Sequence, residues 1–374
     1  MFFKPGTLLL IVVSSLLLSS CSPPEVIHVG YLGGLSGRVT DLGIGGLNGV
    51  RLATEIRNKQ GGIKGHLIEV VEADDQQEPE IARQAIERLI ERKVVAVIGP
   101  MTSAMAMATV PQINQAKLLM LSPTVTTGDL SGIDDYFFRV IPATRDFVKT
   151  NADYYHRTLG LQKIRLVYDV RNKSYTESWL KEFTEYFKAS GGHTLPAIAF
   201  SSSDETRFTE LARQTLQDKP EGIIIISNSV DAAMLCQSLR KLNPAIFIGT
   251  SEWAATERLP ELGGKSVEGI TVAQFFDRQS TQASYLTFKA AYIKRFNREP
   301  GFAELFAFDA ANIIFAALES QTPKQSLKAA ILAKKTFPNA QNQIIFDANG
   351  DTEGRTFMVA IKNGSYVPLP AIPQ

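Results

Sequence analysis

The stretch VVAVIGPMTSAMA, residues 94–106, decides how this chain is expected to fold. Its five leading apolar residues predict a short strand that is buried on both faces. A Gly-Pro pair ends that strand, and Thr102 and Ser103 follow where a helix is expected to begin. A buried strand that leads directly into a helix is the building unit of a parallel α/β sheet.

The two hydroxyl residues at this turn allow two interpretations. Ser and Thr side chains commonly cap a helix by accepting hydrogen bonds from its first free N–H groups. A helix N-terminus also carries partial positive charge and free donors, which together make an anion-binding site. On this stretch alone the cap is the simpler interpretation of Thr102 and Ser103.

Strand-like and helix-like segments alternate along the chain in two series. The strand-like segments of the first series are VIHVGYLGG (26–34), LIEVVEAD (67–74), VVAVIG (94–99) and LLMLSP (118–123). Those of the second are IRLVYDV (164–170), TLPAIAF (194–200), GIIIIS (222–227) and AIFIGT (245–250). Short buried strands that alternate with helices predict parallel sheets, and two such series predict two doubly wound, Rossmann-like α/β lobes. Three further helices are expected between residues 283 and 334, packed on a sheet already built.

Ligands of open α/β sheets bind outside the carboxyl ends of the strands. The loops expected at these ends are 99–103, 122–127, 169–175, 227–230 and 250–253. The hydroxyls of Thr102 and Ser103 therefore lie on the binding edge of the first lobe, as do those of Thr124 and Thr126.

The N-terminal segment predicts export from the cell. It contains Lys4 and an apolar run over residues 7–18, which is short of the ~20 residues that a membrane span needs. The run ends in Leu-Ser-Ser-Cys, which resembles a bacterial lipobox. We therefore expect residues 1–20 to be a lipoprotein signal peptide, and residues 21–26 to be a lipidated Cys21 with its tether. A plain signal peptide with an incidental cysteine is the alternative.

Composition and motifs argue against several classes of function. Lys plus Arg number 39 and Asp plus Glu number 38, so the chain has no charge excess suited to nucleic acid. None of the four histidines has a metal-site spacing, and no G-x-S-x-G nucleophile elbow occurs. The glycine-rich run 43–49 fails as a dinucleotide motif because Asn48 replaces its third glycine. Cys236 is the only cysteine after Cys21 and is expected to be a buried thiol. The sequence thus predicts no metal, no cofactor and no enzymatic activity.

Five successive segments resemble the signatures of branched-chain amino acid (Leu/Ile/Val) binding proteins. They are GYLGGLSGRVTDLG (30–43), NKQGGIKGHLIEVVEADDQQEP (58–79), KVVAVIGPMTSAMAMATVP (93–111), LLMLSPTVTTGDL (118–130) and YFFRVIPAT (136–144). This family consists of type I periplasmic binding proteins, the solute receptors of ABC importers. The resemblance implies two lobes joined by three hinge crossovers that close on a solute. The first lobe would comprise residues 27–144 and 275–354, and the second residues 145–274 and 355–370.

The resemblance also assigns solute contacts in the first lobe. In amino-acid-binding members the α-carboxylate is held by the hydroxyl residue after the Gly-Pro-type turn and by the Ser-Pro-x-x-Thr turn. The matching residues here are Ser103, Thr124 and Thr126, with Met101 and Thr102 beside them. The cap and the anion site can then be one feature, because a ligand carboxylate can satisfy first-turn N–H groups.

In the second lobe, family members place an aromatic residue after the first strand and an acid after the last, which pairs with the α-ammonium. Tyr175 and Glu252 are the nearest matches. The neighbouring Trp253 either offers a stacking face or packs in the core. Asn228 or Ser229 stands at a position that is aromatic in branched-chain amino acid binders. Leu42 likewise replaces an aromatic in the first lobe, and these two departures put leucine itself in question as the solute.

Together these features predict a lipid-anchored, extracytoplasmic solute receptor on a bacterial membrane, facing the periplasm or the cell exterior. Its partners would be a small amino acid or related carboxylate and the permease subunits of an ABC importer. A sensor module of the same fold that reports to a membrane receptor or kinase is the alternative. An exported hydrolase would need a nucleophile or metal that the sequence does not offer.

Overall fold

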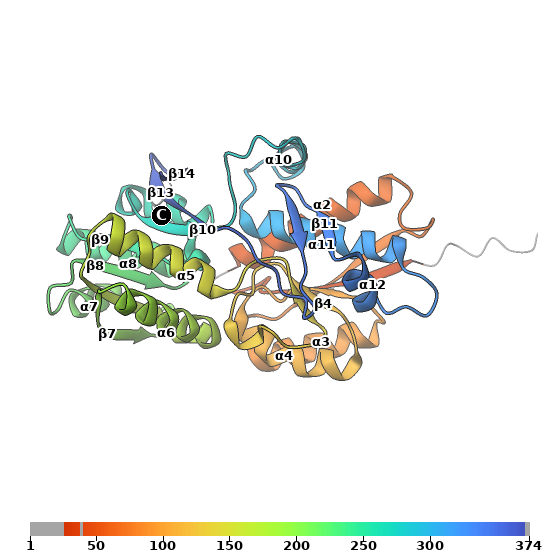
Figure 1. The fold of residues 1–374 in the computed structure, drawn as a ribbon, viewed down its shortest axis with the longest axis horizontal. Helices are drawn as coiled ribbons and strands as arrows, with labels where there is room; N and C mark the ends of the chain where they lie inside the picture. Colours follow the sequence, from red (N-terminus) through yellow and green to blue (C-terminus); the bar gives the residue numbers. More distant parts are fainter. Residues whose placement is uncertain (1–25, 38–39, 371–374) are drawn as a thin grey trace, which may run out of the picture.

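The computed structural model describes residues 26–37 and 40–370, which form two α/β lobes lying side by side along the long axis of the molecule (Figure 1). The predicted signal peptide and Cys21 lie outside the described residues. The two-lobed fold with parallel sheets agrees with the prediction. None of the helices in the described part of the chain is both long and apolar enough to cross a membrane.

The first lobe is built on a five-stranded parallel sheet in the order β2-β1-β3-β4-β5. Its strands are β1 (Ile27–Gly33), β2 (Ile68–Asp74), β3 (Val97–Ile98), β4 (Met120–Ser122) and β5 (Phe137–Arg139). Its helices are α2 (Asp41–Lys59), α3 (Pro79–Glu91), α4 (Ser103–Ala116), α10 (Ala283–Phe296), α11 (Phe302–Ser320) and α12 (Leu327–Lys334). The strand predicted over 94–99 is thus shorter than expected, although the backbone bonds from Val95 to His28 and from Gly99 to Leu121 extend its pairing.

The late helices of the chain complete this first lobe, as the sequence led us to expect. Helix α11 packs against α2 and reaches strands β3 and β4. The two helices approach closely because α2 carries glycines at the contact. A Cβ atom on Gly49 would lie 2.1 Å from the Glu304 carbonyl oxygen, so only glycine fits there. A small hairpin, β11 (Thr336–Pro338) and β12 (Gln343–Ile345), follows α12.

The second lobe is built on a seven-stranded sheet in the order β14-β13-β10-β9-β8-β6-β7. Its strands are β6 (Lys163–Asp169), β7 (His193–Phe200), β8 (Gly222–Ile226), β9 (Phe247–Thr250), β10 (Thr271–Gln274), β13 (Phe357–Lys362) and β14 (Ser365–Pro368). Its helices are α5 (Thr144–Asp153), α6 (Lys173–Ala189), α7 (Phe208–Thr215), α8 (Ser229–Leu242) and α9 (Arg258–Gly263). The five strands β6 to β10 pair in parallel, whereas β13 and β14 join antiparallel.

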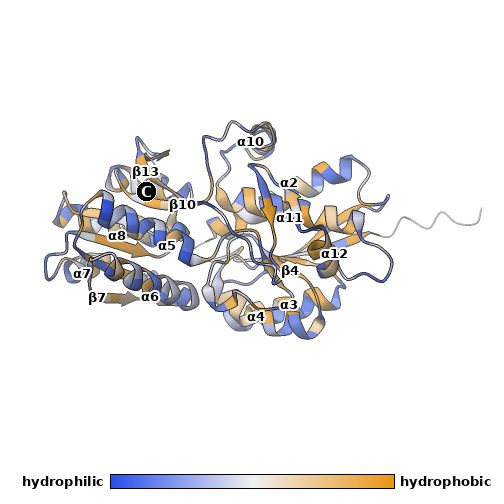
Figure 2. Ribbon diagram, in the orientation of Figure 1, coloured by the Kyte–Doolittle hydropathy of each residue, from blue (hydrophilic) through white to orange (hydrophobic). Residues whose placement is uncertain are grey.

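Hydrophobic residues explain why the sheets lie inside. All five residues of β8 are buried, as its Gly-Ile-Ile-Ile-Ile sequence predicts for a strand covered on both faces. In Figure 2 the strands are predominantly orange, whereas the covering helices are mixed with blue. Cys236 on α8 is fully buried in this core, and burial raises the pKa of its thiol to about 12, as expected for an inert core thiol.

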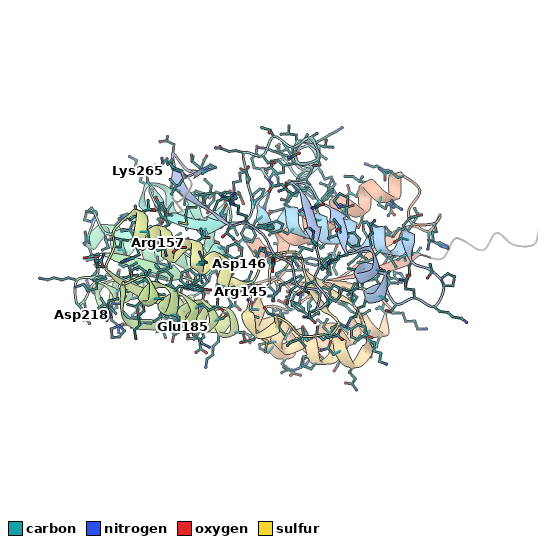
Figure 3. All side chains as sticks on the ribbon, in the orientation of Figure 1. Arg145, Asp146, Arg157, Glu185, Asp218 and Lys265 are labelled. Atoms are coloured by element: carbon teal, nitrogen blue, oxygen red, sulfur yellow. The ribbon has the colours of Figure 1, made fainter. Side chains whose placement is uncertain are left out.

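The chain passes between the two sheets three times: from β5 to α5, from β10 to α10 and from β12 to β13. Arg145 and Asp146, labelled in Figure 3, lie on the first of these crossovers where the lobes meet. A partly buried ion pair links the third crossover to the first lobe. Arg139 donates from Nε to Asp351 at 2.6 Å and from Nη1 to the Thr127 carbonyl at 2.9 Å. The crossover is therefore tied to the loop that carries Thr124 and Thr126.

Candidate functional site

A small cavity lies between the two lobes at the carboxyl ends of their strands, and we call it the cleft cavity. Its volume is about 20 Å³, room for about one water molecule. The first lobe lines it with Leu42, Met101, Thr102, Ser103, Thr124, Thr126, Ile141 and Phe302. The second lobe lines it with Asn172, Tyr175, Glu252 and Trp253. Every residue predicted to contact a solute lies here except Asn228.

The N-terminus of α4 points into the cleft cavity, but its hydroxyls do not cap it. Thr102 is the N-cap residue and makes no side-chain capping bond. Ser103 instead accepts a hydrogen bond from the Thr127 N–H at 3.4 Å. The Ala104 N–H of the first helical turn donates at 2.9 Å to the side-chain carbonyl of Asn172, a residue of the second lobe. The simple cap interpretation is therefore wrong, and an oxygen from across the cleft accepts from one first-turn N–H of α4.

The threonines of the 122–127 loop lie beside this helix end. Thr124 Oγ1 donates to the Met101 carbonyl at 2.7 Å, which joins the loops after β3 and β4. Thr126 is 1% exposed, and its Oγ1 accepts a hydrogen bond from Thr144 at 3.0 Å. Thr144 begins α5 at the first crossover. Thr126 is thus held next to the first crossover between the lobes.

Glu252 faces these hydroxyls from the second lobe, directly after β9. Its carboxylate accepts hydrogen bonds from Trp179 Nε1 at 3.2 Å and from Thr126 Oγ1 at 3.4 Å. The side chain forms no ion pair with any described Lys or Arg, and the residue is 7% exposed. Burial raises the pKa of Glu252 to about 7, although the bonds from Trp179 and Thr126 oppose that rise. A buried carboxylate without a cation is an acceptor suited to an ammonium group.

Two aromatic rings form the remaining second-lobe wall. Tyr175 on α6 and Trp253 meet edge to face, with ring centroids 5.8 Å apart. Both residues are less than 10% exposed. Their rings and the Glu252 carboxylate line the same cavity.

Asn228 lies away from the cleft cavity. It is the N-cap of α8, where its side-chain oxygen accepts from the Asp231 N–H at 2.9 Å. Its amide nitrogen donates to the Asp231 carboxylate at 2.7 Å, so its polar groups are already paired. The structure therefore gives Asn228 a capping role within its own lobe.

Three lining residues were not predicted: Ile141, Asn172 and Phe302. Asn172 lies on the loop 169–175, which is one of those expected at the carboxyl ends of strands. Nothing in its sequence context distinguishes it from its neighbours. Ile141 sits at the first crossover, whose course depends on both sheets. Phe302 arrives on α11, and the helical pattern there does not reveal which side chain reaches the cleft.

Comparison with known proteins places the chain in a family. A sequence model of the family described as "Periplasmic binding protein" matches residues 26–365. The chain belongs to this family of periplasmic binding proteins. The family consists of binding proteins rather than enzymes, which confirms that part of the prediction.

Individual relatives of this periplasmic binding protein are distant but cover nearly all of it. The Leu/Ile/Val-binding protein of Escherichia coli K12 is 24% identical over 359 residues, covering 95% of each chain. The leucine-binding protein LivK of Thermotoga maritima has a TM-score of 0.85 at 23% identity, covering 93% of this chain and 99% of its own. The structure of an ABC transporter solute-binding protein of R. palustris in complex with benzoate has a TM-score of 0.84 at 19% identity. The match covers 93% of this chain and 96% of the R. palustris chain. The two structural matches support the two-lobed fold.

Proposed function

We propose that this periplasmic binding protein is the solute receptor of an ABC importer and binds an amino acid between its lobes. One observation carries the proposal: the two sides of the cleft cavity have opposite polarity. The first lobe presents neutral donors around the α4 N-terminus, and the second presents the unpaired Glu252 carboxylate. A zwitterion bound as the lobes close on it would have each charge on its complementary side, and the cavity of about 20 Å³ must widen to admit it.

The carboxylate end of the solute is assigned to Ser103, Thr126 and the α4 N-terminus. No Lys or Arg is among the described residues that line the cleft cavity, so hydroxyls, backbone N–H groups and the helix dipole are the groups that we assign to an anion there. Burying a carboxylate is costly unless it is hydrogen-bonded. Bonds to a charged group contribute about 1.5–3 kcal/mol each, so a few of them reach the roughly −8 kcal/mol of a micromolar site. The Asn172 oxygen, which occupies the Ala104 N–H, is the group that an entering carboxylate would displace.

The proteins that this chain resembles support carboxylic acids as the class of solute. The E. coli relative is named for leucine, isoleucine and valine, and the R. palustris structure contains benzoate. Glu252 favours the amino acid over a plain aromatic acid in this chain, because a second buried anion beside an unpaired carboxylate would be repelled.

Anchoring at Cys21 and delivery to a permease complete the proposal. The lipobox resemblance supports a lipid anchor, which would hold the soluble lobes at a bacterial membrane surface. The closed pair of lobes would then form the surface that docks on the permease subunits. Cys21→Ser should move the protein from the membrane fraction to the soluble fraction. If the variant still pellets with membranes after a salt wash, Cys21 is not the anchor.

A ligand screen tests the solute class. Thermal denaturation of the purified protein would be followed with L-amino acids, their desamino acids and benzoate, with buffer alone as the reference. We expect at least one L-amino acid to raise the melting temperature well above the effect of its desamino analogue. Stabilisation by benzoate or desamino acids without any amino acid effect would contradict the proposal.

A further inference from the structure

A second and larger cavity adjoins the cleft cavity, and we call it the acidic cavity. Its volume is about 520 Å³, and both lobes line it. From the first lobe come the start of α2 and the segment 298–304, and from the second the segment 256–261 with the start of α8. Phe302 lines both cavities, and the consecutive residues Asp41 and Leu42 line one each. Leu42 and Phe302 therefore stand at the boundary between the two.

Among the described residues that line the acidic cavity, carboxylates outnumber cations. The acidic residues are Asp41, Glu257, Glu261, Glu299 and Glu304, and the basic ones are Arg258 and Arg298. Both arginines are already paired with carboxylates of the same cavity: Arg298 with Glu304 at 2.6 Å and Arg258 with Glu261 at 3.5 Å. Glu257 and Glu299 are in turn paired with Arg278 and Lys289, each at 2.8 Å. Asp41 is therefore the lining carboxylate without a described ionic partner, and its charge makes the cavity suited to a positive group.

Asp41 carries the negative charge that no described Lys or Arg offsets. Its Oδ2 accepts hydrogen bonds from Ser229 and Thr256, each at 2.6 Å, and both donors are hydroxyls of the second lobe. Neutral donors hold a carboxylate in place without cancelling its charge. Because these bonds cross the cleft, the acidic cavity takes this form only while the lobes are closed.

Glu304 adds a second, deeply buried carboxylate to the same cavity. It is 4% exposed, and burial raises its pKa, with the nearby Glu257 carboxylate raising it further. Arg298 is the only described cation paired with it. An additional positive charge in the cavity would relieve this repulsion.

We propose that the solute is an amino acid with a basic side chain, whose distal ammonium or guanidinium group occupies the acidic cavity beside Asp41. This rests on the proposed function, which places the α-carboxylate and α-ammonium in the cleft cavity. The aliphatic stem then passes the apolar side chains of Leu42 and Phe302, as the stems of Lys and Arg pack on apolar surfaces in proteins. An organic cation is the fitting class, because the described residues contain no cluster of metal-ligating side chains.

The test uses two pairs of ligands that differ in the distal charge. Titration calorimetry of the purified protein would compare L-arginine with L-citrulline and L-lysine with L-norleucine. We expect the charged member of each pair to bind at least tenfold more tightly. Asp41→Asn should bring this ratio close to one, since it keeps the side-chain shape and removes the charge.

Ser229→Ala is the matched control, because it removes one bond across the cleft and leaves the Asp41 charge. It should weaken both members of a pair by the same factor and preserve their ratio. Equal affinity within both pairs, or a ratio that survives Asp41→Asn, overturns the inference. If leucine or norleucine binds while arginine and lysine do not, the inference fails and the proposed function stands. If no amino acid binds, both fail.

Discussion

The first-lobe and second-lobe walls of the cleft cavity hold charge by different means. The first-lobe wall contains hydroxyls and the N-terminus of α4, none of which titrates near neutral pH. The second-lobe wall contains Glu252, whose pKa burial raises to about 7. The first-lobe half of the site therefore keeps its polarity at all physiological pH values, whereas the charge of the second-lobe half depends on pH.

Removing the second-lobe charge should have the largest effect on affinity for the solute. Glu252→Gln keeps the hydrogen-bonding shape and deletes the charge that faces the solute ammonium. Losing one partner of a buried charge pair costs about 2–5 kcal/mol, so we expect affinity for the amino acid to fall by roughly thirtyfold or more. Calorimetry with the desamino analogue is the control, and its affinity should change far less. Equal losses for both ligands would show that Glu252 does not face an ammonium group.

A change of pH should produce the next largest effect. An ammonium ligand needs ionised Glu252, and the pKa of about 7 lies above the usual value for Glu, so the carboxyl becomes protonated as pH falls below 7. Affinity should therefore be constant well above pH 7 and fall by roughly tenfold between pH 8 and pH 6. Glu252→Gln should remove this dependence. A profile that stays flat in the unmodified protein would contradict the raised pKa or the assigned contact.

Removing a first-lobe hydroxyl should have a smaller, pH-independent effect. Ser103→Ala deletes one neutral donor to the solute carboxylate, which is expected to cost about 1–2 kcal/mol, or roughly five- to thirtyfold in affinity. Exposed Ser203→Ala serves as the matched control and should not change affinity. If Ser103→Ala binds as the unmodified protein does, the Ser103 side chain does not contact the solute.

The smallest effect is expected at Asn172, which joins the two walls. Its oxygen bonds the Ala104 N–H across the cleft, and a solute carboxylate would compete for the same donor. Asn172→Ala should therefore change affinity by only a fewfold, because it weakens closure but also frees that N–H. Asn172→Asp should weaken binding much more, since its charge would repel the carboxylate. Stopped-flow measurement of solute binding would compare the two variants. Equal binding by Asn172→Ala and Asn172→Asp would place Asn172 outside the site.

The same two walls show how far the sequence could predict the site. Ser103, Thr124 and Thr126 follow buried strands directly, so the strand-end rule placed them at the cleft. What faces them depends on how the second lobe sits on the first. Asn172 supplies the acceptor that the local sequence assigns to Thr102 or Ser103. Phe302 comes from α11, which joins the first lobe after strands β6 to β10 of the second lobe have formed along the chain.

Asn228 illustrates the same limit within one strand-end loop. The loop 227–230 lies at the carboxyl end of β8, as predicted, but not all of its side chains face the other lobe. Asn228 caps α8 within its own lobe, whereas the next residue, Ser229, bonds Asp41 across the cleft. Backbone direction at a helix start decides which neighbour faces the other lobe, and a single sequence does not specify it.

The division of charge between the lobes is tested most directly by a crystal structure of the protein with a bound L-amino acid. We expect an α-carboxylate oxygen within hydrogen-bond distance, about 2.7–3.2 Å, of Ser103 Oγ or the first-turn N–H groups of α4. We expect the α-ammonium at a similar distance from the Glu252 carboxylate. An ammonium group directed at the α4 N-terminus, or a solute bound away from both walls, would contradict this division of charge.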